Sequence, residues 1–251
     1  MNSLHVSLVV CLLIFAGSIF GISLRRVLPD KHFCAATETT IRLVTGFLVT
    51  MTGLVLGMLV SSAKSSYDGQ KVLVAQMSSQ IILLARALDE YGPEANPIRS
   101  YLRETVEAAA DHVWPAREST PVTLRPENKM DMLEAQLKEL TPKNSSQVNA
   151  KSHLISILAD LRQSSWALFI QSDTNKLSMP LLIILVSWIV TIFISFGLYA
   201  PPNPTVIATM LIGALAVSAA ILIIMEMYSP FNGILRISSD PIREAIHQLK
   251  H

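Results

Sequence analysis

The chain has 251 residues, of which 51% are hydrophobic and 16% are charged, and its formal net charge is +1. Ordinary soluble domains carry about 25% charged residues. The low charge argues against a soluble enzyme, and the near-neutral balance gives no reason to expect a nucleic-acid partner.

Four long apolar segments are arranged as two pairs around a polar middle. They cover approximately residues 4–24, 41–63, 177–200 and 205–228. A helix needs about 20 mostly apolar residues to cross a hydrocarbon core of ~30 Å. We therefore predict an all-α membrane protein with four transmembrane helices. The first of them is expected to be retained rather than cleaved as a signal peptide, because its start lacks Lys and Arg and its apolar run is long.

The polar middle of the chain carries most of its charged residues. A stretch of this length can build its own helical core, which predicts a water-facing domain inserted between the second and third transmembrane helices. The predicted division places transmembrane helices 1 and 2 in residues 1–63, a helical soluble domain in 64–176, and transmembrane helices 3 and 4 in 177–228. A C-terminal turn and a short helix occupy 229–251.

The soluble domain is predicted to consist of helices only. Its first helix carries an apolar stripe with alternating steps of three and four residues. The stripe consists of Val74, Met77, Ile81, Leu84, Leu88 and Tyr91. Gly92 and Pro93 are expected to end this helix. Because no proline separates it from the second apolar segment, we predict that the second and third membrane helices continue into the soluble domain as unbroken rods.

Small residues four positions apart predict close helix packing in the membrane. The first apolar segment contains Gly17 and Gly21, and the second contains Gly53 and Gly57. Such pairs let helix backbones approach closely, and in lipid this packing replaces the hydrophobic driving force.

A polar stripe with the same spacing lies in the third apolar segment. It consists of Ser187, Thr191 and Ser195. These hydroxyls either line a water-filled path or belong to a close helix–helix seam, and the seam is the commoner arrangement.

Two residues near the end of the fourth segment are candidates for a pore or gate. Glu226 is an ionisable residue in or near the bilayer, where such groups usually face the protein interior, a cavity or a partner. It is either a pore-lining carboxylate or an interfacial acid that contacts water or Arg236. Phe231 follows in a turn set by Pro230 and Gly233, and it is either a gate or a structural corner.

Nothing in the sequence predicts an enzyme, a metal site or another cofactor. Cys11 and Cys34 form neither a disulfide framework nor a zinc motif, and the six histidines show no ligand spacing. No P-loop, HExxH or GxSxG motif is present.

The distribution of Lys and Arg near the membrane ends gives a predicted orientation. Positive charges flank the soluble domain and occur in the C-terminal tail, although the first loop is also basic. Counting them places the soluble domain and both termini in the cytoplasm.

Several stretches of the chain together resemble the bestrophin-like family of bacterial membrane proteins. They lie in residues 45–50, 54–59, 63–68, 88–94, 114–115, 169–172, 196–201 and 230–241. The resemblance extends over nearly the whole chain. It implies four membrane helices, with a helical cytoplasmic domain between the second and the third.

The family name further implies a remote kinship to bestrophins, which are pentameric anion channels. Bestrophins gate with apolar rings on their second membrane helix, so Leu54 and Leu56 are gate candidates by this analogy. The chain departs from the family pattern at Tyr228, where an acid often follows two residues after the position of Glu226. The resemblance implies no catalytic residues.

The leading functional hypothesis is a homo-oligomeric, channel-like protein of the bacterial inner membrane, with the lipid bilayer and small ions as its partners. One alternative is a non-conducting scaffold or sensor whose soluble helices bind a partner. Another is a stress or defence effector that perturbs the membrane.

Overall fold

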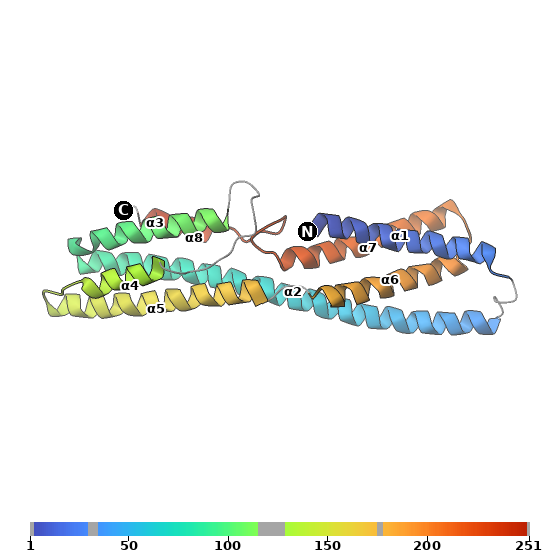
Figure 1. The fold of residues 1–251 in the computed structure, drawn as a ribbon, viewed down its shortest axis with the longest axis horizontal. Helices are drawn as coiled ribbons and strands as arrows, with labels where there is room; N and C mark the ends of the chain where they lie inside the picture. The colour runs from blue at the N-terminus through green and yellow to red at the C-terminus, as the bar shows by residue number, and fades with distance from the viewer. Residues whose placement is uncertain (1–2, 30–34, 115–128, 175–177, 250–251) are drawn as a thin grey trace. The chain divides into compact units, whose positions relative to one another are not determined.

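The computed structural model describes residues 3–29, 35–114, 129–174 and 178–249, and these ranges contain helices but no strand. Figure 1 labels the elements in chain order. They are α1 (Ser3–Val27), α2 (Ala35–Tyr91), the 3-10 turn η2 (Pro93–Ala95), α3 (Asn96–Val113), α4 (Lys129–Glu139), α5 (Ser145–Thr174), α6 (Met179–Tyr199), α7 (Pro204–Met227) and α8 (Asp240–Gln248). The prediction of an all-α protein is confirmed.

Four of the described helices are long and apolar enough to cross a membrane, namely α1, α2, α6 and α7. They coincide with the four apolar segments of the sequence, the second of which forms the first part of α2. An uninterrupted apolar helix suits a membrane because every backbone hydrogen bond is made within the helix itself.

The chain divides into two compact units. Unit 1 comprises Met1–Ser65 and Leu177–Tyr228, and unit 2 comprises Ser66–Lys176 and Ser229–His251. The first part of α2 therefore belongs to unit 1 and its second part to unit 2. The C-terminal turn and α8 belong to unit 2.

In unit 1, α1 packs along both α6 and α7. Ile14, Leu185 and Ile221 are among the most deeply buried side chains of its apolar cluster. Leu59 and Ala63 of α2 join the same cluster. Ser7 adds a polar link, because its hydroxyl donates a hydrogen bond of 2.8 Å to a carbonyl oxygen of α7.

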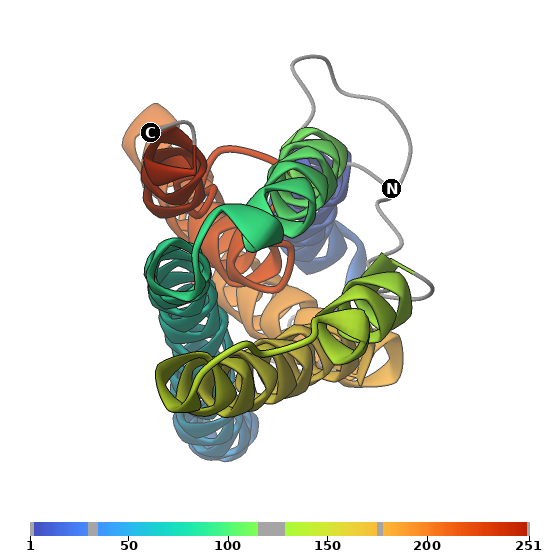
Figure 2. The ribbon, with the colours of Figure 1, turned by 90° about the vertical axis from the view of Figure 1, so that its left-hand side faces the viewer.

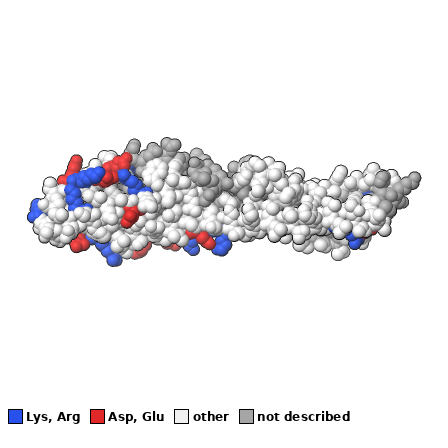
Figure 3. Space-filling view, turned by 90° about the horizontal axis from the view of Figure 1, so that it is seen from below, with Lys and Arg blue, Asp and Glu red and all other residues white. Residues whose placement is uncertain are grey.

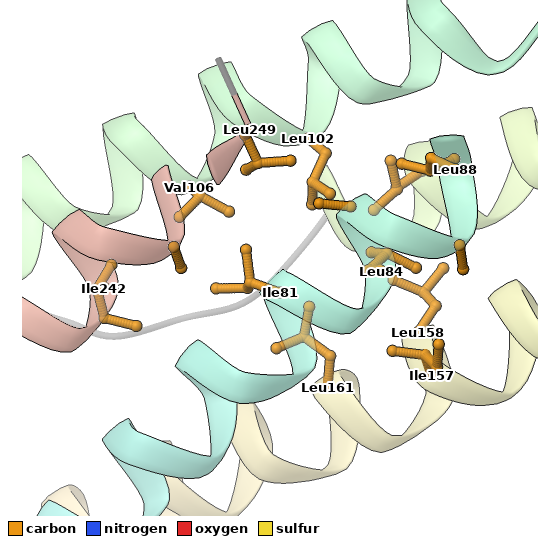
Figure 4. Close-up of a cluster of buried hydrophobic side chains, with 14 of the residues drawn as sticks. Ile81, Leu84, Leu88, Leu102, Val106, Ile157, Leu158, Leu161, Ile242 and Leu249 are labelled. Atoms are coloured by element: carbon orange, nitrogen blue, oxygen red, sulfur yellow. The ribbon is translucent and has the colours of Figure 1, made fainter. Parts of the chain in front are cut away.

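Unit 2 is a helical bundle around one apolar cluster, to which α2, α3, α4, α5 and α8 contribute. Figure 2 views these helices from the end of the bundle. In the close-up of Figure 4, Ile81 and Leu84 of α2 point towards side chains of α3, α5 and α8, including Val106, Leu161 and Ile242. The apolar stripe predicted on α2 is thus confirmed as core, with only Met77 partly exposed.

The turn after α2 is set by Gly92, whose φ of 116° favours glycine. Side chains from the start of α5 and the loop before it hold this turn. Gln147 donates a hydrogen bond of 3.0 Å to the carbonyl oxygen of Tyr91, and Lys143 pairs with Glu94 at 2.6 Å. The predicted end of the helix at Gly92 and Pro93 is therefore confirmed.

The prediction of two unbroken rods is half right. Helix α2 runs without interruption for 57 residues, from Ala35 to Tyr91. By contrast, α5 ends at Thr174, Ser178 has extended backbone angles, and α6 begins at Met179. Pro180 explains the break, since proline lacks an N–H and its ring clashes with the preceding turn. A continuous rod through the third membrane helix was therefore wrong.

Charged side chains gather on unit 2. In Figure 3 they lie mainly over unit 2, whereas the visible face of unit 1 is nearly free of them. This distribution follows the sequence, in which most charges lie between the second and third apolar segments.

Candidate functional site

Unit 1 contains all the residues predicted to pack helices or to line a path, except Phe231. The described part of this unit places them in three settings. One group lies on the seam between α1 and α6, a second is exposed or half-buried on α2 and α6, and Glu226 is buried near the end of α7.

The seam between α1 and α6 is built on glycines. A Cβ atom added to Gly21 would overlap the carbonyl oxygen of Ile194, and one added to Gly197 would overlap the carbonyl oxygen of Ser18. Gly17 lies one turn earlier on the same seam, where an added Cβ would be 3.1 Å from a side chain of α6. The bare backbone at these positions is what allows the two helices to approach so closely.

Gly197 is the member of this seam that the sequence pattern does not single out. It has no small residue four positions away, since Phe193 precedes it and Pro201 follows it. Its one signal in the sequence is that it is the only glycine of α6.

The first part of α2 contains glycines in a different setting. In the most apolar stretch of 18 residues in α2, 17% of the residues are buried, compared with 50% in the corresponding stretch of α1. A Cβ added to Gly46, Gly53 or Gly57 would meet no described atom within 4 Å. These glycines and Thr50 are three or four residues apart and share one side of the helix, which we call the small-residue face. Gly53 and Gly57 thus pack against no other part of the described chain.

A second exposed side of α2, adjacent to the small-residue face, carries bulky apolar residues. Phe47, Leu54 and Met58 are 61%, 68% and 75% exposed. The two gate candidates differ here, because Leu56 is half-buried and packs against the apolar cluster of unit 1. Only Leu54 is placed so that a molecule beside α2 would meet it.

The three polar residues of α6 make hydrogen bonds within their own helix. The hydroxyls of Ser187, Thr191 and Ser195 donate to backbone carbonyl oxygens three or four residues earlier, at 2.7, 2.9 and 3.0 Å. Ser187 and Thr191 are exposed and Ser195 is half-buried. Hydroxyls bonded in this way can face lipid or water equally well, because their donor is already satisfied.

Glu226 is 4% exposed and lies in the last turn of α7. It does not face solvent in the single chain. Two residues later, the phenol of Tyr228 donates a hydrogen bond of 3.2 Å to the hydroxyl of Ser62 on α2. A carboxylate buried at such a position is costly, so its environment in the protein must compensate for lost hydration.

Phe231 lies in the apolar core of unit 2, where it is 7% exposed. Its ring meets Trp114 edge to face, with centroids 5.7 Å apart. In the described part of the chain the ring is thus enclosed by this core, and both roles predicted for it stay predictions.

A cavity of about 330 Å³ lies in unit 2 and was not apparent in the sequence. Its walls come from α2, α3, α4, α5 and α8, and most are apolar, including Met77, Val106 and Leu168. Its ionisable lining residues are His112 and Lys129. Because the walls come from five separate helices, no local motif could have revealed this cavity. Among the described residues, no group of three His, Cys, Asp or Glu is placed to hold a metal ion.

Taken together, the helices define a multi-span helical membrane protein. The family model described as the Bestrophin-like domain matches residues 11–242, so the chain belongs to the bestrophin-like family. Its fold is similar to the crystal structure of a mutant of a bacterial bestrophin homologue from Klebsiella pneumoniae, with a TM-score of 0.61. The two chains are 13% identical, and the match covers 97% of each. No curated protein sequence matches this chain.

Proposed function

We propose that the protein is a homo-oligomeric ion channel of the bacterial inner membrane, selective for anions by analogy with bestrophins. Membership of the bestrophin-like family supports the proposal of a channel-like membrane protein. The observation that carries the proposal is the small-residue face of α2, where a Cβ added to Gly46, Gly53 or Gly57 would meet no described atom within 4 Å.

In lipid, helices associate through surfaces where small residues let backbones come close. The α1–α6 seam uses this principle within the chain, and the small-residue face of α2 offers a second surface of the same kind. We therefore assign it to a contact between copies that surround a central path. In a closed ring, Leu54 would lie beside this path, and a ring of such side chains is a means of gating. The number of copies is five by analogy only.

In this proposal unit 2 is the soluble domain, inserted between the second and third membrane helices, and it forms a cytoplasmic vestibule. Its charged surface suits contact with water. Reporter fusions at the two termini test the orientation, since a fluorescent protein matures in the cytoplasm and alkaline phosphatase is active outside it. Phosphatase activity at either terminus would contradict it.

The first test is the subunit number, measured by native mass spectrometry of the detergent-purified protein. A closed ring of four or more chains is expected. Gly57→Leu should dissociate the ring, because its side chain would fill the small-residue face. Met58→Leu, on the adjacent bulky side, should leave the ring intact. An unchanged oligomer in Gly57→Leu would exclude this face as the contact.

Ion flux then tests conduction. Vesicles that contain the wild-type ring should release chloride faster than vesicles without protein, and Leu54→Ala should increase the rate. A ring that conducts no ion under any tested condition would contradict the channel proposal while leaving the assembly intact.

The second candidate function is a membrane-anchored sensor, and the cavity in unit 2 favours it. Its volume and largely apolar lining are typical of small-molecule sites. A monomer or dimer in the mass spectrum would favour this function over the channel, because neither provides an axial path.

A further inference from the structure

The cavity in unit 2 has a buried floor and an exposed mouth. Its floor includes Ile81, Leu161 and Ile242, which are 3%, 0% and 5% exposed. Figure 4 shows these three side chains, which come from α2, α5 and α8. The lining also includes His112 of α3 and Lys129 of α4, and both of these residues are exposed. In the described part of the chain, the cavity therefore opens to the surface of unit 2 beside His112 and Lys129.

Hydrogen bonds hold two walls of this cavity in place. Ser78 of α2 donates a hydrogen bond to the carbonyl oxygen of Pro241, which is the residue before Ile242. The indole N–H of Trp114, another lining residue, donates a hydrogen bond of 2.8 Å to the carbonyl oxygen of Ile237. These bonds fix the start of α8 and the end of α3. The cavity is therefore preformed, as sites for small molecules usually are.

The size and polarity of the cavity define the body of a ligand. Its volume of about 330 Å³ lies near the lower end of the range of roughly 300 to 1,000 Å³ found for small-molecule sites. This volume suits one short acyl chain better than a lipid with two long chains. The uncharged hydroxyl side chains in its wall are Thr105 and Ser165, and Ser165 already donates a hydrogen bond of 2.8 Å to the carbonyl oxygen of Leu161. The interior therefore favours an apolar body that needs few hydrogen bonds.

The charge of the mouth selects a head group. The ionisable residues of the described lining are His112 and Lys129, and this lining contains no Asp or Glu. A lysine ammonium has three N–H donors, and a histidine ring has at least one. Hydrogen bonds from such donors to a carboxylate are stronger than those between neutral groups. A carboxylate at the mouth would thus meet two donors and no like charge from the described lining.

We infer that unit 2 binds a medium-chain fatty acid, with the acyl chain in the cavity and the carboxylate at Lys129 and His112. An alcohol of the same length would lose the charged contact with Lys129, and a cationic amphiphile would be repelled by it. The inference names a ligand class for the sensor, our second candidate function, and rests on that function. It depends neither on a ring of subunits nor on conduction.

Photolabelling of the full-length protein in lipid nanodiscs tests this site. The probe is decanoic acid that carries a diazirine at the far end of its chain, and peptide mass spectrometry locates the labelled residues. Nanodiscs replace detergent, because detergent molecules compete for apolar cavities. We expect labels on buried lining residues such as Ile81 and Leu161. Decanoate should displace the probe about tenfold more effectively than decanol or decyltrimethylammonium, since one charged hydrogen bond contributes about this factor.

Two variants test the head-group contact and the mouth. Lys129→Glu reverses the charge at the mouth and should decrease labelling of the cavity about tenfold. Lys71→Glu reverses an exposed charge of α2 outside the lining and should leave labelling unchanged. Ala109→Trp adds a bulky side chain at an exposed position of the lining and should also decrease labelling. None of these substitutions replaces a buried residue, so the variants should fold, and circular dichroism checks this.

Labels confined to the apolar helices α1, α6 and α7 would show partition into lipid only and would overturn the inference. Equal displacement by decanol and decanoate, or unchanged labelling in Lys129→Glu, would overturn it as well, because the cavity would then not select a carboxylate. If a variant fails to fold, displacement from the wild-type protein decides. A ring that conducts ions but shows no label in the cavity would refute the ligand and leave the channel proposal intact.

Discussion

Trp114 and Phe231 meet edge to face, with ring centroids 5.7 Å apart and ring planes at 81°. The contact joins the end of α3 to the loop that leaves the last membrane helix. The ring of Phe231 is held in the core of unit 2, which predicts a structural role for it.

Phe231→Ala should therefore destabilise the protein. Loss of a buried phenylalanine typically costs about 3–5 kcal/mol. The unfolding midpoint in denaturant, followed by tryptophan fluorescence in detergent, measures the loss. Val72→Ala, which truncates a residue 64% exposed on α2, should change the midpoint little. Normal stability with altered ion flux in Phe231→Ala would instead identify the ring as a gate.

The glycines of α1 and α2 should respond differently to the same substitution. Gly21→Ala places a Cβ against the carbonyl oxygen of Ile194, so the helices must separate, and we expect a loss of about 1–3 kcal/mol. Gly53→Ala adds a methyl group in open space and should leave the stability of the monomer unchanged or slightly higher, because alanine favours a helix over glycine. Thermal melting in detergent distinguishes the two variants. Equal melting temperatures would mean that the α1–α6 seam is looser than described.

Glu226→Gln tests the buried acid of α7. If its charge acts on a nearby ion path, the reversal potential in a salt gradient should shift while the oligomer stays intact. Glu104→Gln removes an exposed charge from α3 and serves as the control. Identical currents from wild type and Glu226→Gln would assign the carboxylate a structural role.

The Lys143–Glu94 pair predicts a pH-dependent contribution to stability. The hydrogen bond from Lys143 lowers the pKa of Glu94, and the same bond raises the pKa of Lys143. The lowered pKa stabilises the fold above the ordinary glutamate value, and this contribution is lost as the pH falls through the pKa of the folded state. The raised pKa stabilises the fold below the ordinary lysine value, and that contribution is lost as the pH rises through the pKa of the folded state.

Glu94→Gln should therefore lower the unfolding midpoint slightly at neutral pH and have no such effect in strong acid. Because both groups are exposed, the difference should also shrink in high salt. A difference that stays constant from acid to neutral pH would show that the pair contributes through packing rather than charge.

Hydropathy and periodicity predicted much of the fold. Length and apolar composition located the four candidate spans, and the stripe from Val74 to Tyr91 located the core side of α2. Both patterns involve residues that are close together in sequence, so they can be recognised without the tertiary structure. The break between α5 and α6 was not predicted although Pro180 marks it, because the proline lies inside the apolar segment, in the first turn of α6.

The candidate site was harder to predict, because the spacing of small residues on a helix does not show which other helix they pack against. Gly17 and Gly21 have the same spacing as Gly53 and Gly57, but only the first pair lies on a seam within the described chain. Phe231 is close in sequence to the end of α7, yet the chain turns and buries it in unit 2. The packing of these glycines and the burial of Phe231 depend on contacts between residues that are distant in sequence. Local spacing in a single sequence does not reveal such contacts.

Helix α2 runs for 57 residues without a break, which corresponds to about 85 Å at 1.5 Å per residue. The hydrocarbon layer is only ~30 Å thick. An aqueous column that followed the helix from end to end would be nearly three times as long as this layer. Because electrical resistance grows with length, such a column would carry a smaller current than one of equal bore confined to the bilayer.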